Sequence, residues 1–148
     1  MPKSSSLFLF PDVNVWIALT WQKHIHHSVA ASWFGGLRDD AHLGFCRITQ
    51  LSFLRLLTTA AVMGSDVRSQ LEAWEMYDQW LDDPRVVFLE EPPALEPTFR
   101  AHAERKDASP KDWADSYLSA FAAVSGLRLV TFDKSFRGRL ENLVLLVG

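Results

Sequence analysis

Three aspartates, Asp12, Asp115 and Asp133, have the type and spacing in this sequence that best suit chemistry. Asp12 directly follows the apolar run LFLFP (7–11), and Asp133 follows LRLVTF (127–132). A short unbroken apolar run is typical of a strand buried on both faces of a parallel sheet. Because ligands gather at the carboxyl ends of such strands, we expect both carboxylates at one edge of the sheet.

Asp115 lies within the apolar stripe of a predicted helix. Ser109 and Pro110 predict the N-cap and first residue of that helix, and Gly126 predicts its end. A lone carboxylate is costly to bury without partners or a cation. The start of this helix and the two strand ends can converge on one cleft in a doubly wound sheet. We therefore expect the three acids to share a site.

A cluster of three carboxylates favours a particular chemistry. The acids repel one another, so at neutral pH they need protons or a divalent cation. Oxygen ligands favour Mg²⁺ or Mn²⁺ over zinc. A divalent ion held this way suits metal-assisted hydrolysis of a phosphodiester, with a water as the nucleophile.

Two of the acidic positions also have structural interpretations. Asp12 can accept backbone N–H groups as the N-cap of a helix over residues 13–21. Asp112 fits a capping box with Ser109, and an alternative is that it supplies further charge to the acidic site.

The histidines at 24, 26 and 27 look like a metal site, but they fall in a predicted loop that lacks a fixed geometry. We expect them to have a structural or solvent role.

Strands alternate with helices along the chain, which indicates an α/β fold with a parallel sheet covered on both faces. The predicted strands are 7–10, 42–46, 86–89, 127–131 and 143–147. The predicted helices are 13–21, 27–37, 47–59, 66–81, 95–105 and 110–126. A length of 148 residues suits one hydrophobic core. We expect residues 1–148 to form a single domain with residues 1–6 frayed.

Composition limits the class of protein. Apolar residues make up 48% of the chain and the formal net charge is −3, so the chain as a whole lacks the charge of a nucleic-acid binder and leaves room only for local basic patches. The single cysteine excludes an intramolecular disulfide and fits a reducing compartment. No apolar run approaches the ~20 residues of a membrane span. We expect a cytoplasmic protein without a membrane partner.

The sequence resembles the PIN-domain nucleases, particularly the VapC-type toxins of bacterial toxin–antitoxin pairs. Four segments in the family's order carry the resemblance: FPDVNVWIAL (10–19), ITQLSFLRLL (48–57), DWADSYLSAFA (112–122) and LRLVTFDKSF (127–136). The resemblance implies a three-layer α/β/α sandwich and a Mg²⁺- or Mn²⁺-dependent endoribonuclease. It also implies a homodimer that a cognate antitoxin inhibits by inserting a segment near the acidic cleft.

By this resemblance Asp12, Asp115 and Asp133 are the catalytic and metal-binding acids. Asn14 matches the asparagine that steadies the first aspartate, and Thr131 matches the hydroxyl residue before the last acid.

The departure from the family pattern is Gln50, where many members carry a glutamate. A glutamine can coordinate through its carbonyl oxygen, but it brings no charge and is no base. Gln50 therefore argues against a tightly held second metal. It also motivates an alternative function, a catalytically weak PIN fold that binds RNA or protein as a regulatory module. A phosphoacceptor built on Asp12 is less favoured, because Asn14 stands where that chemistry needs a second acid.

Overall fold

A five-stranded parallel sheet forms the centre of the computed structural model, which describes residues 8–148. The expected fraying of residues 1–6 and the start of the first strand at Leu7 lie outside the described residues. The strands are β1 (Phe8–Pro11), β2 (His42–Phe45), β3 (Val86–Phe88), β4 (Arg128–Thr131) and β5 (Leu143–Leu145). Their order is β3-β2-β1-β4-β5, and all four neighbouring pairs are parallel. The predicted parallel α/β fold is confirmed.

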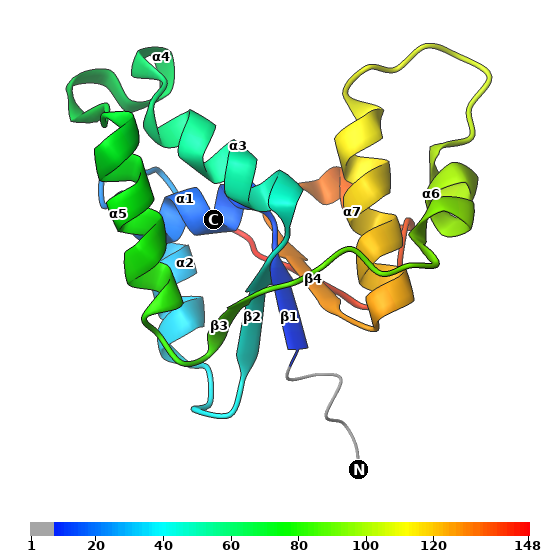
Figure 1. Cartoon of the computed structure of the whole chain (residues 1–148), viewed down its shortest axis with the longest axis horizontal. Helices are drawn as coiled ribbons and strands as arrows, with labels where there is room; N and C mark the ends of the chain where they lie inside the picture. The colour runs from blue at the N-terminus through cyan, green and yellow to red at the C-terminus, as the bar shows by residue number, and fades with distance from the viewer. Residues whose placement is uncertain (1–7) are drawn as a thin grey trace.

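Helices cover both faces of the sheet, as Figure 1 shows. The helices are α1 (Val13–Thr20), α2 (His27–Gly35), α3 (Arg47–Leu57), α4 (Ala60–Met63), α5 (Gln70–Leu81), α6 (Leu95–Ala103) and α7 (Asp112–Ser125). Two short 3₁₀ turns, η2 (Gly64–Asp66) and η3 (Lys134–Phe136), complete the elements. Helices α1 to α5 lie on one side of the sheet and α6 and α7 on the other (Figure 1). The longest described helix, α7, has 14 residues, and none is long and apolar enough to cross a bilayer.

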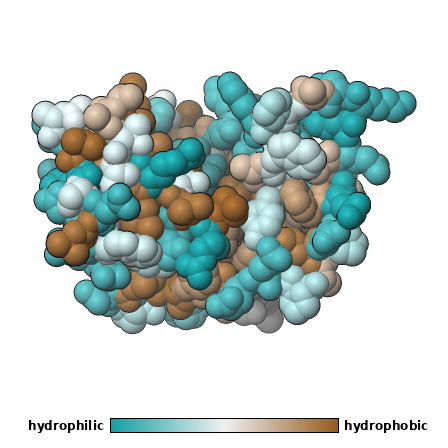
Figure 2. Space-filling view, turned by 45° about the horizontal axis from the view of Figure 1, so that its top comes forward, coloured by the Kyte–Doolittle hydropathy of each residue, from teal (hydrophilic) through white to brown (hydrophobic). Residues whose placement is uncertain are grey.

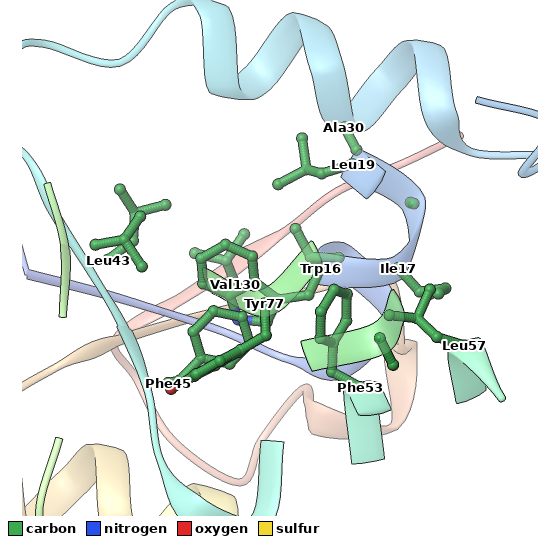
Figure 3. Close-up of a cluster of buried hydrophobic side chains, with 14 of the residues drawn as sticks. Trp16, Ile17, Leu19, Ala30, Leu43, Phe45, Phe53, Leu57, Tyr77 and Val130 are labelled. Atoms are coloured by element: carbon green, nitrogen blue, oxygen red, sulfur yellow. The ribbon is translucent and has the colours of Figure 1, made fainter. Parts of the chain in front are cut away.

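Two hydrophobic clusters hold these layers together. On the α1 side Trp16 stacks on Phe45 with ring centroids 4.0 Å apart, and Tyr77 of α5 meets the same phenyl ring edge-on (Figure 3). On the α7 side Phe10 of β1 stacks on Phe121 with centroids 5.0 Å apart. Successive strand residues face opposite layers, so the central strands supply both clusters: Leu9 and Val130 pack on the α1 side, and Phe10 and Leu129 on the α7 side. Both layers therefore pack against β1 and β4.

The pairing of β1 with β4 sets the carboxyl edge of the sheet. Pro11 pairs with Val130, and the N–H of Asp12 donates to the carbonyl of Val130 at 2.8 Å. The polar residues that follow β1 and β4 therefore begin at the same position along the strand direction.

Gly126 ends α7 in the left-handed conformation, with φ of 69°, as the sequence predicted.

Helix starts differ from two of the predictions. Helix α7 begins at Asp112 rather than Pro110, and Ser109 is not its N-cap. The Asp112 side chain binds arginines instead of closing a capping box. The helix predicted from residue 66 begins at Gln70, because Ser69 and Glu72 form a capping box there with bonds of 3.1 and 2.9 Å. The short helix α4 was not predicted.

Candidate active site

Asp12 is the most enclosed of the three acids, with 7% of its surface exposed. One carboxylate oxygen accepts the N–H of Val13 at 2.7 Å, so Asp12 does cap α1. The other oxygen accepts the Thr131 hydroxyl at 2.9 Å and the amide of Asn14 at 3.3 Å. The capping role and the acidic site therefore belong to one carboxylate, with a different oxygen for each.

Asn14 and Thr131 extend this network to the turn after β4. The Asn14 amide nitrogen also donates to the Thr131 hydroxyl at 3.2 Å, and its carbonyl oxygen accepts the N–H of Phe132 at 3.2 Å. The Thr131 hydroxyl oxygen accepts the N–H of Asp133 at 3.0 Å. These bonds join the end of β1 to the end of β4 and orient the backbone at both aspartates. Their catalytic importance stays a prediction.

Asp115 and Asp133 approach the same region from α7 and β4. Asp115 lies half-buried in the first turn of α7, and Asp133 caps η3 by accepting the N–H of Ser135 at 2.9 Å. The pKa of Asp12 is raised to about 6, chiefly because the carboxyl is buried; hydrogen bonds from Thr131 and Val13 oppose the rise, and the charges of Asp115 and Asp133 add to it. Burial and the charge of Asp133 likewise raise the pKa of Asp115. The negative charges of the three carboxylates therefore interact.

The oxygens around Asp12 fit a hard divalent cation in chemistry and charge. They belong to carboxylates, an amide and a hydroxyl, which are the donors that Mg²⁺ and Mn²⁺ prefer. A cation would offset the repulsion that raises the pKa of Asp12. Between residues 8 and 148, however, no three His, Cys, Asp or Glu side chains are close enough to hold a metal as they stand. The donor types and the charge thus suit a divalent cation, but the described side chains do not form a complete set of metal ligands in this structure.

Gln50 is buried in the first turn of α3, with 7% of its surface exposed. Its carbonyl oxygen accepts a hydrogen bond of 2.6 Å from Nη1 of Arg47. The guanidinium carbon of Arg47 lies 4.6 Å from the centre of the Phe88 ring. The one Gln50 atom able to coordinate a cation is therefore bound to a guanidinium. The i, i+3 spacing of Arg47 and Gln50 on a predicted helix is the sequence signal for this pair.

Asp112 is bound by two arginines. It accepts hydrogen bonds from Arg139, from Arg105 at 3.5 Å and from the Ser116 hydroxyl at 2.7 Å. The hydrogen bond from Arg139 and then that from Ser116 lower the pKa of Asp112. Arginines match its charge within the fold, and that charge also contributes to the raised pKa of Asp115, so the alternative that Asp112 supplies the charge missing at Gln50 stays a hypothesis.

The three histidines after α1 make structural contacts. A ring nitrogen of His27 lies 2.7 Å from the carbonyl of Ala18, and the His24 ring accepts the N–H of His26 at 3.0 Å. The His26 ring stacks on Phe132 with centroids 4.6 Å apart. These contacts pack the loop between α1 and α2 against the turn after β4, as a structural role requires.

Comparisons with known proteins agree with this fold. The PIN domain family model matches residues 9–139. Ribonuclease VapC41 of Mycobacterium tuberculosis is 42% identical over 132 residues, covering 86% of this chain and 90% of the relative. The crystal structure of VapBC2 from Rickettsia felis bound to a promoter DNA fragment has a TM-score of 0.65 at 15% identity, covering 93% and 96% of the two chains. M. tuberculosis VapC20, a Sarcin-Ricin loop cleaving toxin, has a TM-score of 0.65 at 16% identity, covering 87% and 92%.

The chain belongs to the PIN-domain family, because the family model spans most of its length. Its identity to Ribonuclease VapC41 further places it among the VapC-type ribonucleases of that family. The resemblance seen in the sequence is confirmed. The two solved structures, at 15% and 16% identity, support the fold alone.

Proposed function

We propose that this protein is a Mg²⁺- or Mn²⁺-dependent endoribonuclease that hydrolyses phosphodiester bonds in RNA and acts as a toxin. The observation that carries the proposal is the buried Asp12 carboxylate, held by Thr131 and Asn14 and facing the charges of two further acids. Asp12, Asp115 and Asp133 hold the metal. When bound, a divalent ion promotes ionisation of water and offsets negative charge on phosphate oxygens.

Hydrogen bonds and packing within the chain orient the three carboxylates in the absence of RNA. Thr131 and Asn14 fix one oxygen of Asp12, so little reorganisation is needed when charge develops on the phosphate. Asp133 is anchored to the sheet because its backbone N–H is bound by Thr131. Asp115 comes from α7, which Phe10 and Phe121 pack against the other face of the same strands. Three separate elements thus present carboxylates to one edge of the sheet.

The protein's partners are RNA, a cognate antitoxin and a second copy of the chain, and it works in the cytoplasm. Its place among the VapC-type ribonucleases supports an antitoxin. Exposed apolar side chains support protein–protein contacts: Leu51 on α3 and Leu71 and Trp74 on α5 are 60%, 71% and 47% exposed. Figure 2 shows apolar surface over the half of the molecule that carries α3 to α5. Apolar patches of this kind mark interaction surfaces.

Cleavage of total cellular RNA by the purified, antitoxin-free chain tests the activity. We expect discrete fragments with Mg²⁺ or Mn²⁺, and no fragments with EDTA or with Asp115→Ala. Circular dichroism and a melting curve establish that the variant is folded. Retained cleavage by folded, metal-free Asp115→Ala protein would refute the proposal.

One observation favours a second function, a catalytically weak module that binds RNA or protein. Gln50 stands where many PIN nucleases carry a glutamate, and its carbonyl oxygen is bound by Arg47. This function predicts RNA binding without turnover at every Mg²⁺ or Mn²⁺ concentration. The cleavage assay therefore separates the two functions.

A further inference from the structure

We propose that Arg47, held in place by Gln50 and Phe88, binds an RNA phosphate that flanks the scissile one, on the β2–β3 side of the acidic site. The inference rests on the proposed function, since it assigns a path to the RNA. Gln50 is the positioning residue for this arginine.

The fold places Arg47 on the correct edge of the sheet. Arg47 is the first residue of α3 and follows β2, and Phe88 is the last residue of β3. The acids Asp12 and Asp133 follow β1 and β4 at the same carboxyl edge. Neighbouring strands lie ~4.8 Å apart, so the end of β3 is ~10 Å from that of β1. An arginine stacked there contacts a neighbouring phosphate and leaves the scissile one to the acids.

Arg47 is ordered before any ligand binds. Its Nη1 donates to Gln50, and its guanidinium lies over the Phe88 ring at 4.6 Å. A guanidinium has five N–H donors in a planar fork, so several remain for a phosphate. The hydrogen bond to Gln50 and the contact with the Phe88 ring restrict the Arg47 side chain, which reduces the conformational entropy that it loses when it binds RNA.

The positive charge of Arg47 is not offset by an ion pair within the described part of the chain. Among the described residues it has no carboxylate within 4.0 Å, whereas five other arginines form ion pairs: Arg38, Arg85, Arg100, Arg105 and Arg139. The residue Arg47 does bind, Gln50, is a neutral acceptor. A glutamate at position 50 would pair with the guanidinium and cancel its charge for the RNA. A neutral side chain at this site is what a phosphate-binding arginine needs.

Binding of a fluorescein-labelled, mixed-sequence single-stranded 20-mer RNA in EDTA tests the inference without cleavage. Anisotropy titrations over a salt series give the Kd and the slope of log Kd against log salt. We expect Arg47→Gln to weaken binding about 3- to 10-fold and to reduce the slope by ~0.7, the value for one lost phosphate contact. We expect Gln50→Glu to change the slope in the same way.

Arg38→Gln is the matched control, because Arg38 precedes β2 at the opposite edge of the sheet and pairs with Asp40 at 3.1 Å. Its Kd and slope should equal those of the wild type. Melting curves verify that all variants are folded. An unchanged slope in Arg47→Gln, or equal changes in Arg38→Gln, overturns the inference.

The assay also separates this inference from the proposed function. A wild-type chain that binds RNA through Arg47 but never cleaves it supports the inference and refutes the nuclease. A chain that cleaves RNA with an unchanged Arg47→Gln slope does the reverse. A wild-type chain that does not bind the RNA overturns the inference outright, and the cleavage of total RNA then judges the nuclease alone.

Discussion

The hydroxyl of Thr131 donates a 2.9 Å hydrogen bond to Asp12, joining the ends of β4 and β1 across 119 positions of the chain. The same oxygen accepts the N–H of Asp133. A single hydroxyl therefore touches one acid through its side chain and another through its backbone. This bond makes Thr131 the most direct test of how the acidic site is oriented.

Thr131→Val removes the hydroxyl while keeping the shape of the side chain. We expect roughly a 10- to 100-fold loss of RNA cleavage, since a hydrogen bond to a charged group contributes about 1.5–3 kcal/mol. The pKa of Asp12 should rise further, because the Thr131 bond now lowers it. Thr131→Ser restores the hydroxyl and should restore most of the activity. Equal rates for the valine and serine variants would show that the bond has no role in cleavage.

The raised pKa of Asp12 makes the metal-free protein less stable at neutral pH. The folded-state pKa of about 6 lies above the ordinary aspartate value of 3.8, so the folded protein binds the proton more tightly than the unfolded chain. The stability that this proton contributes is complete below the unfolded-state value and is lost as pH rises through the folded-state value. The difference is roughly 3 kcal/mol at most.

We therefore expect Asp12→Asn to abolish cleavage and yet stabilise the metal-free chain at pH 7.5. Urea unfolding in EDTA at pH 5.0 and 7.5 measures this as the difference in unfolding free energy between variant and wild type. Subtracting the wild type cancels the opposite pH dependence of Asp83 and Asp112, whose pKa values are lowered. The advantage of the variant should grow with pH. An advantage that shrinks as pH rises would contradict the environment assigned to Asp12.

Divalent metal should reverse this instability. Mg²⁺ or Mn²⁺ at 100 times its Kd stabilises the folded state by about 2.7 kcal/mol, if it binds that state alone. We expect the metal to raise the Tm of the wild type at pH 7.5 and to have little effect on Asp12→Asn. Melting curves with and without metal measure both. A Tm that responds equally in the two proteins would place the metal elsewhere.

Two aspartates three residues apart on α7 should behave in opposite ways. Asp112→Asn removes the ion-pair partner of Arg139 and one of the two partners of Arg105, so we expect a lower Tm while the folded fraction retains cleavage. Asp115→Asn removes a carboxylate that is repelled by Asp133, so we expect lost cleavage without a lower Tm. Parallel measurements of Tm and of rate per folded molecule distinguish them. The same phenotype in both variants would contradict these assignments.

The exposed apolar side chains on α5 should matter for assembly rather than chemistry. Leu71→Asp places a charge on a side chain that is 71% exposed, so the fold should tolerate it. We expect it to weaken either self-association or antitoxin binding, measured by light scattering of the chain alone and with its antitoxin. Glu75→Asp on the same helix is the control and should leave both unchanged. No change in either assembly for Leu71→Asp would remove this surface from the interfaces.

The sequence by itself determined the fold class and the sheet edge at which the acids lie. Both follow from local patterns. The apolar runs before Asp12 and Asp133 mark buried strands, and Gly126 marks the end of α7, without knowledge of distant residues. Burial of a short segment depends mainly on its own side chains, so buried strands and helix ends can be predicted from a single sequence.

Only the tertiary structure decided which partners the polar side chains take. Asp112 fits a capping box locally, but Arg139, 27 residues later, binds it instead. Arg47 and Gln50 lie three residues apart on α3, so their pairing is local, but only the fold brings Phe88 of β3 against the same guanidinium. The strength of a hydrogen bond or ion pair depends on distance and orientation in space. Packing of segments far apart in the chain sets both, so the pairing appears only in the folded molecule.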